Sequence, residues 1–138
     1  MQKIGRLLTA MVTPFDADGE INYKQARKLA SALLSSGSDG LVIGGTTGEA
    51  PSMSDEEKIK LYAEVKEEIG DKGSVIAGTT DNNHRKSINL SKEAEKVGAD
   101  GLLLTVPAYN KPQQEGLYEH FKAIAESSSL PGILYNVP

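Results

Sequence analysis

The sequence predicts an α/β fold with a parallel sheet, arranged as a partial (β/α)8 TIM barrel of about five strands and four helices. Short runs of β-branched residues and leucine recur at intervals of about thirty residues, the spacing expected of strands in βαβ units. Amphipathic segments with the period of a helix lie between these runs. The first run ends in Thr13-Pro14-Phe15 and not in the G-x-G-x-x-G that opens a dinucleotide-binding sheet.

The elements follow one another in strict alternation. In the first helical segment, Ala26, Leu29, Ala30, Leu33 and Leu34 fall on one face, which is the pattern of a helix that packs against a sheet. The predicted strands are residues 7–12, 40–43, 74–77, 101–106 and 132–135, and the predicted helices are residues 22–34, 55–69, 83–97 and 114–127.

Two helix ends carry clear signals. Ser54 precedes the second helix and Glu57 follows three positions later, which predicts a capping box. The third helix stops at Gly98, a residue that readily adopts the left-handed conformation that ends many helices.

A short pattern also repeats after two βα units. Gly37-Ser38-Asp39-Gly40-Leu41-Val42-Ile43 resembles Gly98-Ala99-Asp100-Gly101-Leu102-Leu103-Leu104, and each closes a helix with glycine, turns through Asp-Gly and enters a strand. A barrel and a doubly wound sheet would both show this repeat. Because a complete barrel takes about 250 residues, we interpret residues 1–138 as the N-terminal part of one barrel domain that ends at its fifth strand.

Composition excludes several classes of function. The net charge is −4, so the chain lacks the basic surface that nucleic-acid binding requires. No apolar stretch is long enough to cross a membrane, and the first residues do not resemble a secretion signal. There is no cysteine, and the two histidines lie far apart in sequence, so we expect no metal site and no cofactor. These features are typical of a cytoplasmic protein.

Three motifs lie at or just past the ends of predicted strands, at the edge where barrels build active sites: 44–49, 107–112 and 135–138. In Gly44-Gly45-Thr46-Thr47-Gly48-Glu49 the glycines let backbone amides approach a small anion, and the absence of a P-loop lysine favours a carboxylate over a nucleoside phosphate. An ordinary glycine-rich loop would also explain this stretch.

Tyr135 is the second candidate. It alternates with Ile133 on the last strand, so we expect both side chains to point into the barrel, where a phenol could transfer protons. A core tyrosine with a satisfied hydroxyl is the alternative.

An ordered set of motifs along the whole chain resembles the dihydrodipicolinate synthase family of pyruvate-dependent class I aldolases. No single motif is decisive, but their order and spacing are specific for the superfamily, and the double threonine favours the synthases. The motifs are 10–15 (AMVTPF), 44–49 (GGTTGE), 76–79 (IAGT) with Asn82, 109–112 (YNKP), 114–118 (QEGLY), 120–124 (HFKAI) and 135–138 (YNVP).

The resemblance implies a homo-oligomeric barrel, usually a tetramer, that condenses pyruvate with aspartate semialdehyde through a lysine Schiff base in lysine (diaminopimelate) biosynthesis. It implies that Thr47, with neighbouring amides such as that of Gly45, holds the pyruvate carboxylate. Tyr135 would donate and accept the proton at the reacting carbons. Thr46 and Tyr109 would extend the relay, with Tyr109 reaching in from an adjacent subunit.

Three departures from the family follow from the same resemblance. It places the Schiff-base lysine and a substrate-binding arginine beyond Pro138, so we expect no synthase activity from residues 1–138 alone. Ala108 stands where the family usually has a tyrosine at its tight dimer interface.

A family effector cleft for lysine is also altered here. Lys86 occupies its acidic position, and Asp55 and Lys58 occupy positions where sensitive members have histidines; among these positions, Asn82 matches.

Two alternatives remain open from the sequence. The chain could belong to a sister enzyme, such as an N-acetylneuraminate lyase or a 2-keto-3-deoxy sugar-acid aldolase. It could also be a non-catalytic half-barrel module whose open strand edges are covered by another copy.

Overall fold

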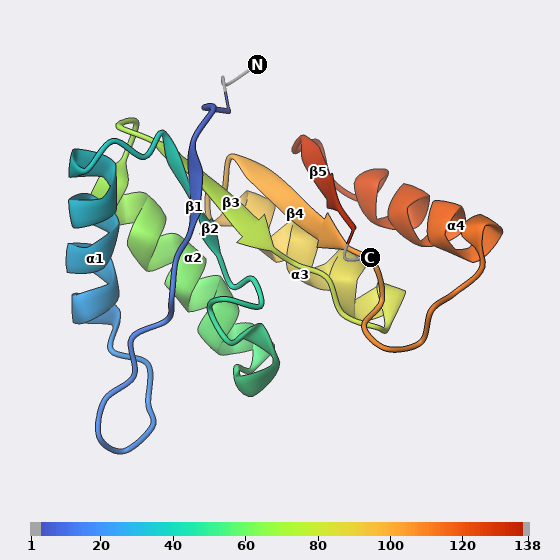
Figure 1. Ribbon diagram of the computed structural model, residues 1–138, viewed down its shortest axis with the longest axis horizontal. Coiled ribbons are helices and arrows are strands. Elements are labelled where there is room, and N and C mark those ends of the chain that lie inside the picture. The colour runs from blue at the N-terminus through green and yellow to red at the C-terminus, as the bar shows by residue number, and fades with distance from the viewer. Residues whose placement is uncertain (1–3, 137–138) are drawn as a thin grey trace.

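The computed structural model describes residues 4–136 and contains the predicted alternation of strands and helices (Figure 1). Val137 and Pro138, which complete the last motif, lie outside the described residues. The strands are β1 (Leu8–Ala10), β2 (Gly40–Ile43), β3 (Ser74–Gly78), β4 (Gly101–Thr105) and β5 (Gly132–Tyr135). The helices are α1 (Tyr23–Ser35), α2 (Asp55–Ile69), α3 (His84–Lys96) and α4 (Gln114–Ala125), with a short 3₁₀ helix at Ala50–Ser52.

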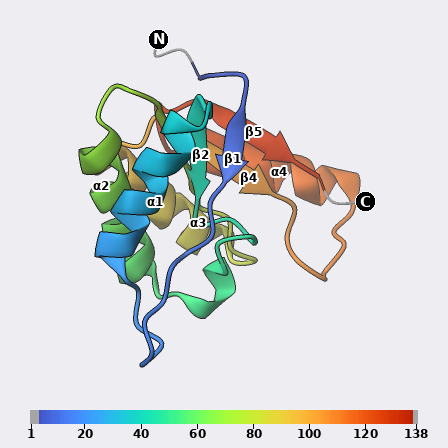
Figure 2. The same cartoon turned by 60° about the vertical axis from the view of Figure 1, so that its left-hand side comes forward.

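The strand order distinguishes a barrel from a doubly wound sheet. The strands lie in the order β1-β2-β3-β4-β5, and every neighbouring pair is parallel. Figures 1 and 2 show the helices arranged along the sheet in the same order, and α1 packs on α2, α2 on α3, and α3 on α4. A doubly wound sheet reverses its strand order part of the way across. The described chain is therefore five strands and four helices of a (β/α)8 barrel.

All predicted boundaries agree with the structure to within two residues. The difference matters most for the first strand, because only the three residues Leu8–Ala10 of the predicted 7–12 are in the ladder. The chain then turns through Pro14, which has no backbone N–H to donate, and makes an isolated antiparallel bridge between Phe15 and Ile21.

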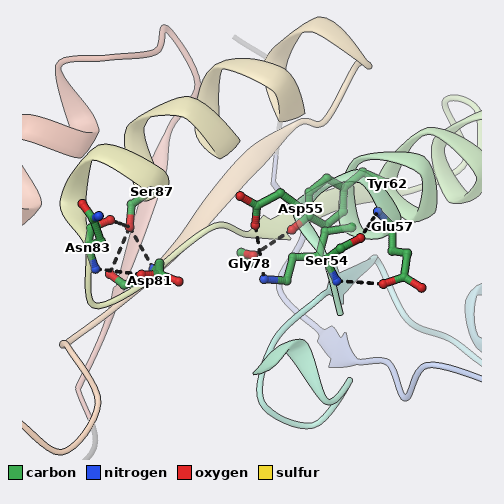
Figure 3. Close-up of polar contacts among 9 residues, drawn as sticks. Ser54, Asp55, Glu57, Tyr62, Gly78, Asp81, Asn83 and Ser87 are labelled. Atoms are coloured by element: carbon green, nitrogen blue, oxygen red, sulfur yellow. Dashed lines mark hydrogen bonds and ion pairs between the residues drawn. The ribbon is translucent and has the colours of Figure 1, made fainter. Parts of the chain in front are cut away.

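The predicted helix ends are confirmed. Ser54 and Glu57 form the complete capping box, with reciprocal hydrogen bonds of 3.2 and 2.7 Å (Figure 3). Gly98 has a φ of +90° and follows the third helix, as predicted.

The hydrophobic core lies between the sheet and its helices. Strand residues of alternate positions face the helices and are buried, and the largest buried side chains of α2 pack against them. This layer consists of Leu41, Ile43, Val75, Ala77, Leu102 and Leu104 from the strands and of Leu61, Tyr62, Val65 and Ile69 from α2. Outside it, Val12 near β1 and Leu134 in β5 are 53% and 63% exposed, so the two edge strands are the least covered.

The sequence repeat has a structural role that its residues did not reveal. Asp39 Oδ2 accepts hydrogen bonds of 2.8 Å from the backbone amides of Arg6 and Leu7, and these bonds lower the pKa of the carboxyl group. At the second copy, Asp100 Oδ2 accepts a bond of 2.8 Å from the amide of Val75. Each aspartate therefore precedes one strand and holds the beginning of the neighbouring strand.

The carboxyl ends of β2 and β3 approach one another closely at two glycines. A side chain at Gly78 would collide with the carbonyl oxygen of Gly44, and a Cβ at Gly44 would lie 3.0 Å from the hydroxyl of Tyr62. Tyr62 is fully buried in α2, and its hydroxyl donates a 2.7 Å hydrogen bond to the carbonyl of Gly78 (Figure 3). Burial raises the pKa of this phenol, so it stays a neutral donor. One hydroxyl therefore fixes the end of β3 directly beside the turn that leaves β2.

Substitution of Asp100 tests the role of the repeated aspartate. Both oxygens of this buried carboxylate lie 3.0 Å from Lys66 Nζ, so Asp100→Asn leaves an ammonium with a poorer partner in a largely buried site. We expect a loss of about 3 kcal/mol in the free energy of unfolding, measured by urea denaturation. Asp71→Asn, at an exposed position, is the control. A loss for Asp100→Asn no larger than that of the control would contradict this role.

Removal of the buried hydroxyl tests the contact between β2 and β3. Tyr62→Phe leaves the Gly78 carbonyl without its donor, and we expect it to cost about 1–3 kcal/mol of the unfolding free energy. The control is Tyr118→Phe, because Tyr118 is exposed and its loss of a hydroxyl should change stability very little. Equal unfolding free energies of the two variants would show that this hydrogen bond does not stabilise the fold.

Candidate active site

A cavity of about 380 Å³ lies at the carboxyl ends of β2, β3 and β4. Three loops meet there: the one after β2, the one after β3 and the one after β4. This is the edge of a (β/α)8 barrel at which active sites form. The lining residues are Gly44, Gly45, Thr46, Ala50, Pro51, Lys58, Gly78, Thr80, Asp81, Asn82, Leu103, Thr105, Val106 and Ala108.

The loop 44–49 is held by its own backbone in a compact turn. The amides of Gly48 and Glu49 donate to the carbonyls of Gly45 and Thr46, each at 3.0 Å. Thr13, which lies shortly after β1, donates a 2.6 Å hydrogen bond from its buried hydroxyl to the Gly48 carbonyl. A Cβ at Gly48 would lie 3.0 Å from the Met11 carbonyl oxygen, so the loop packs tightly against the segment that follows β1.

Backbone amides of this loop remain available to a ligand. Within residues 4–136, the N–H groups of Gly45, Thr46 and Thr47 donate to no protein acceptor. Consecutive unpaired amides in a tight turn can form the kind of concavity that binds small anions. The loop is therefore chemically suited to hold a carboxylate.

The structure brings some of the predicted site residues together. Gly45 and Thr46 line the cavity, whereas Thr47 is exposed and does not line it. Tyr135 is paired in register with Thr105 of β4, and Ile133 with Leu103. Since residues paired in register share a face of the sheet, Tyr135 stands on the same face as Thr105 and Leu103, which line the cavity.

Tyr109 lies apart from these residues. Its side chain is 98% exposed and its φ is +71°, in the left-handed region that non-glycine residues seldom adopt. It lines neither this cavity nor the two other surface hollows, which lie beside α4. Within the described residues, therefore, Tyr109 points outward into solvent.

Lys58, which the sequence places only at an altered position of the effector cleft, lines the cavity. Only 9% of its surface is exposed, and its Nζ lies 3.7 Å from Oδ1 of Asp55. Lys58 is one turn before Leu61 and Tyr62 on the buried side of α2, and that helical spacing is the signal that could have located it.

The two histidines lie closer together than their separation in sequence suggests. His84 and His120 line a second hollow of about 470 Å³ between α3 and α4. Burial lowers the pKa of His120, and its Nε2 atom has no hydrogen-bond partner among the described residues. Within residues 4–136, no group of three or more potential side-chain ligands is placed to hold a metal ion.

Neither the fold nor this site involves a membrane-spanning helix. Each helix in residues 4–136 is too short or too polar to cross a bilayer.

Comparison with known proteins gives a consistent answer. A family model described as the dihydrodipicolinate synthetase family matches residues 3–138. The 4-hydroxy-tetrahydrodipicolinate synthase of Moorella thermoacetica is 60% identical over 134 residues, which are 97% of this chain and 46% of that protein. The crystal structure of dihydrodipicolinate synthase from Bacillus anthracis is 51% identical, with a TM-score of 0.96 over 100% of this chain and 47% of that one. The synthase of Cyanidioschyzon merolae, solved with lysine bound, is 43% identical, with a TM-score of 0.95 over 98% of this chain and 46% of that one.

The chain spans about half the length of the curated relatives it matches. The family model, by contrast, covers nearly every residue of this chain, and the similar structures superimpose on the same five strands and four helices. The chain belongs to the dihydrodipicolinate synthetase family.

Proposed function

We propose that this chain forms the first half of the barrel of a 4-hydroxy-tetrahydrodipicolinate synthase, a lyase that condenses pyruvate with aspartate semialdehyde. The observation that carries the proposal is the loop 44–49, because it leaves the amides of Thr46 and Thr47 free and because its residues Gly44, Gly45 and Thr46 line a cavity at the carboxyl edge of the sheet. A keto acid could place its carboxylate on these amides and its carbonyl toward the barrel axis.

The other predicted residues have complementary roles in this proposal. Tyr135, on the face of Thr105, is the proton donor and acceptor at the reacting carbons. Thr46 lines the cavity and extends the relay from Tyr135. Tyr109 completes the proton relay of a neighbouring copy of the protein, so the functional unit is a homo-oligomer. Its exposed, outward position supports this role.

The covalent step requires an amine that is partly unprotonated and faces the bound keto acid. Among the described residues, no lysine lies on a strand; each lies on a helix or in a loop. Lys58 is the lysine that lines the cavity, but it lies on α2 near the carboxylate of Asp55. We therefore assign the Schiff base to a lysine outside residues 1–138, and this chain supplies binding and proton transfer.

The sister aldolases use the same keto acid, so substrate assays must separate them from the synthase. The names and identities of the relatives favour the synthase. With the full-length protein, we expect turnover of pyruvate with aspartate semialdehyde and no cleavage of N-acetylneuraminate or 2-keto-3-deoxy sugar acids. Sugar-acid cleavage without condensation would replace the proposal with the sister enzyme, and inactivity in both assays would favour a non-catalytic module.

Borohydride trapping tests the assignment of the nucleophile. The full-length protein is reduced in the presence of pyruvate, digested, and its adduct located by mass spectrometry. We expect one pyruvyl adduct, on a lysine outside residues 1–138, and no adduct when residues 1–138 are treated alone. Reduction without pyruvate is the control. A stoichiometric adduct on Lys58, or on another lysine of this chain, would show that the nucleophile has been misassigned.

Inhibition assays test whether lysine regulates the protein. Lys58 lines the cavity together with Asn82 and Ala108, and Lys86 is exposed on the first turn of α3. Two ammonium groups about 4 Å apart near a protein surface repel one another by about 4 kcal/mol. We therefore expect no inhibition of condensation by lysine.

The matched variant is Lys86→Glu, which restores an acidic residue at this position and should increase sensitivity to lysine if the cleft accepts it. Clear inhibition of the unaltered protein by submillimolar lysine would contradict the expectation.

A further inference from the structure

The side chain of Asn82 clamps the residue that immediately precedes Tyr109. Asn82 Oδ1 accepts a 2.7 Å hydrogen bond from the amide of Ala108, and Asn82 Nδ2 donates a 3.1 Å hydrogen bond to the carbonyl of Ala108. One carboxamide therefore satisfies both backbone groups of a residue that is 26 positions away. A paired contact of this kind restricts rotation as well as distance, so it orients the chain that follows.

Asn82 is itself held in place from both sides. The hydroxyl of Ser87, which is fully buried in α3, accepts from the Asp81 amide at 2.8 Å and donates to the Asp81 carbonyl at 3.1 Å. Asp81 Oδ1 accepts from the Asn83 amide at 2.7 Å, and Asn83 caps α3 (Figure 3). Because these contacts fix the neighbours of Asn82 to the start of α3, the clamp holds the loop after β4 in a defined position relative to that helix.

The loop that receives the clamp is conformationally strained. Tyr109 and Lys111 both have positive φ, +71° and +44°. Such conformations are energetically unfavourable for non-glycine residues and persist where surrounding contacts impose them. Tyr109 is almost fully exposed, so its own ring adds little packing. The contacts that fix it are those at Ala108, whose carbonyl also accepts from the Asn110 amide at 2.9 Å.

We infer that Asn82 is a positioning residue for Tyr109: its carboxamide sets the direction in which the loop presents the tyrosine hydroxyl. The inference rests on the proposed function for the part played by Tyr109 in the proton relay. Asn82 acts on that chemistry through Ala108 and touches no reacting atom in this scheme.

Hydrogen exchange in the full-length protein tests the clamp without any assay of activity. In Asn82→Ala, peptides that cover residues 106–112 should exchange about five- to tenfold faster, as expected for the loss of a paired hydrogen bond. Peptides from β4, a core strand, should keep their protection and serve as the internal reference. Gln113→Ala is the matched control, because Gln113 is an exposed amide of the same loop whose side chain makes no cap hydrogen bond. Unchanged exchange of residues 106–112 in Asn82→Ala would overturn the inference.

Steady-state kinetics test the link to Tyr109. We expect Asn82→Ala to lower kcat about tenfold while KM for pyruvate changes less than about twofold, because the loop acts after the keto acid is bound. Asn82→Ser, which keeps a polar residue that suits turns but is too short to make both bonds, should show the same split. In a Tyr109→Phe background, the Asn82→Ala substitution should produce little further loss, since both changes disable one relay.

Independent, multiplicative losses in the double variant would overturn the link between the two residues. Absence of condensation activity in the unaltered full-length protein would overturn the proposed function, and hydrogen exchange would still decide whether Asn82 positions the loop.

Discussion

The close approach of β2 and β3 at Gly44 and Gly78 is the contact on which the candidate site depends. Neither position tolerates a side chain, since one faces a backbone carbonyl and the other faces the ring of Tyr62. The Tyr62 hydroxyl then satisfies the Gly78 carbonyl inside the core. Because Gly44 is the first residue after β2, this packing determines where the loop 44–49 leaves the sheet. The packing of Gly44 therefore also determines where the free amides of Thr46 and Thr47 lie.

Beyond this contact, side chains from one loop hold the backbone of the next. The Thr13 hydroxyl donates to Gly48, Thr80 Oγ1 accepts from the Thr105 amide at 2.8 Å, and Asn82 binds Ala108. The first and third contacts join loops that follow neighbouring strands, and the second joins the loop after β3 to the last residue of β4. Polar groups at the carboxyl edge of the sheet therefore have two roles. Some fix neighbouring segments relative to one another, and others remain free to bind a ligand.

The fold could be predicted almost entirely from sequence because its signals are local. The alternation of strands and helices, the capping box at Ser54 and the left-handed Gly98 each depend on residues within a few positions. The local pattern alone suits both a barrel and a doubly wound sheet, so the strand order needs the ordered motifs as well. The sequence predicts a longer first strand than the structure has, because the apolar run continues past the point where the chain leaves the ladder.

The site was predictable only in part, because its contacts join distant segments. The loop 44–49 follows a strand and Tyr135 ends one, so both could be recognised by position. The inward position of Lys58, the hydroxyl bond of Tyr62 and the clamp of Asn82 depend on the packing of α2 and on loops brought together by the sheet. The shared hollow of His84 and His120 arises in the same way, between two helices that follow successive strands.

A structure of the full-length protein, with pyruvate reduced onto its nucleophilic lysine, would show where the keto acid binds. We expect the pyruvyl carboxylate to lie within hydrogen-bond distance of the amides of Thr46 and Thr47, and the Tyr135 hydroxyl to face the reacting carbons. A carboxylate bound elsewhere in the barrel, with the loop 44–49 empty, would contradict this expectation.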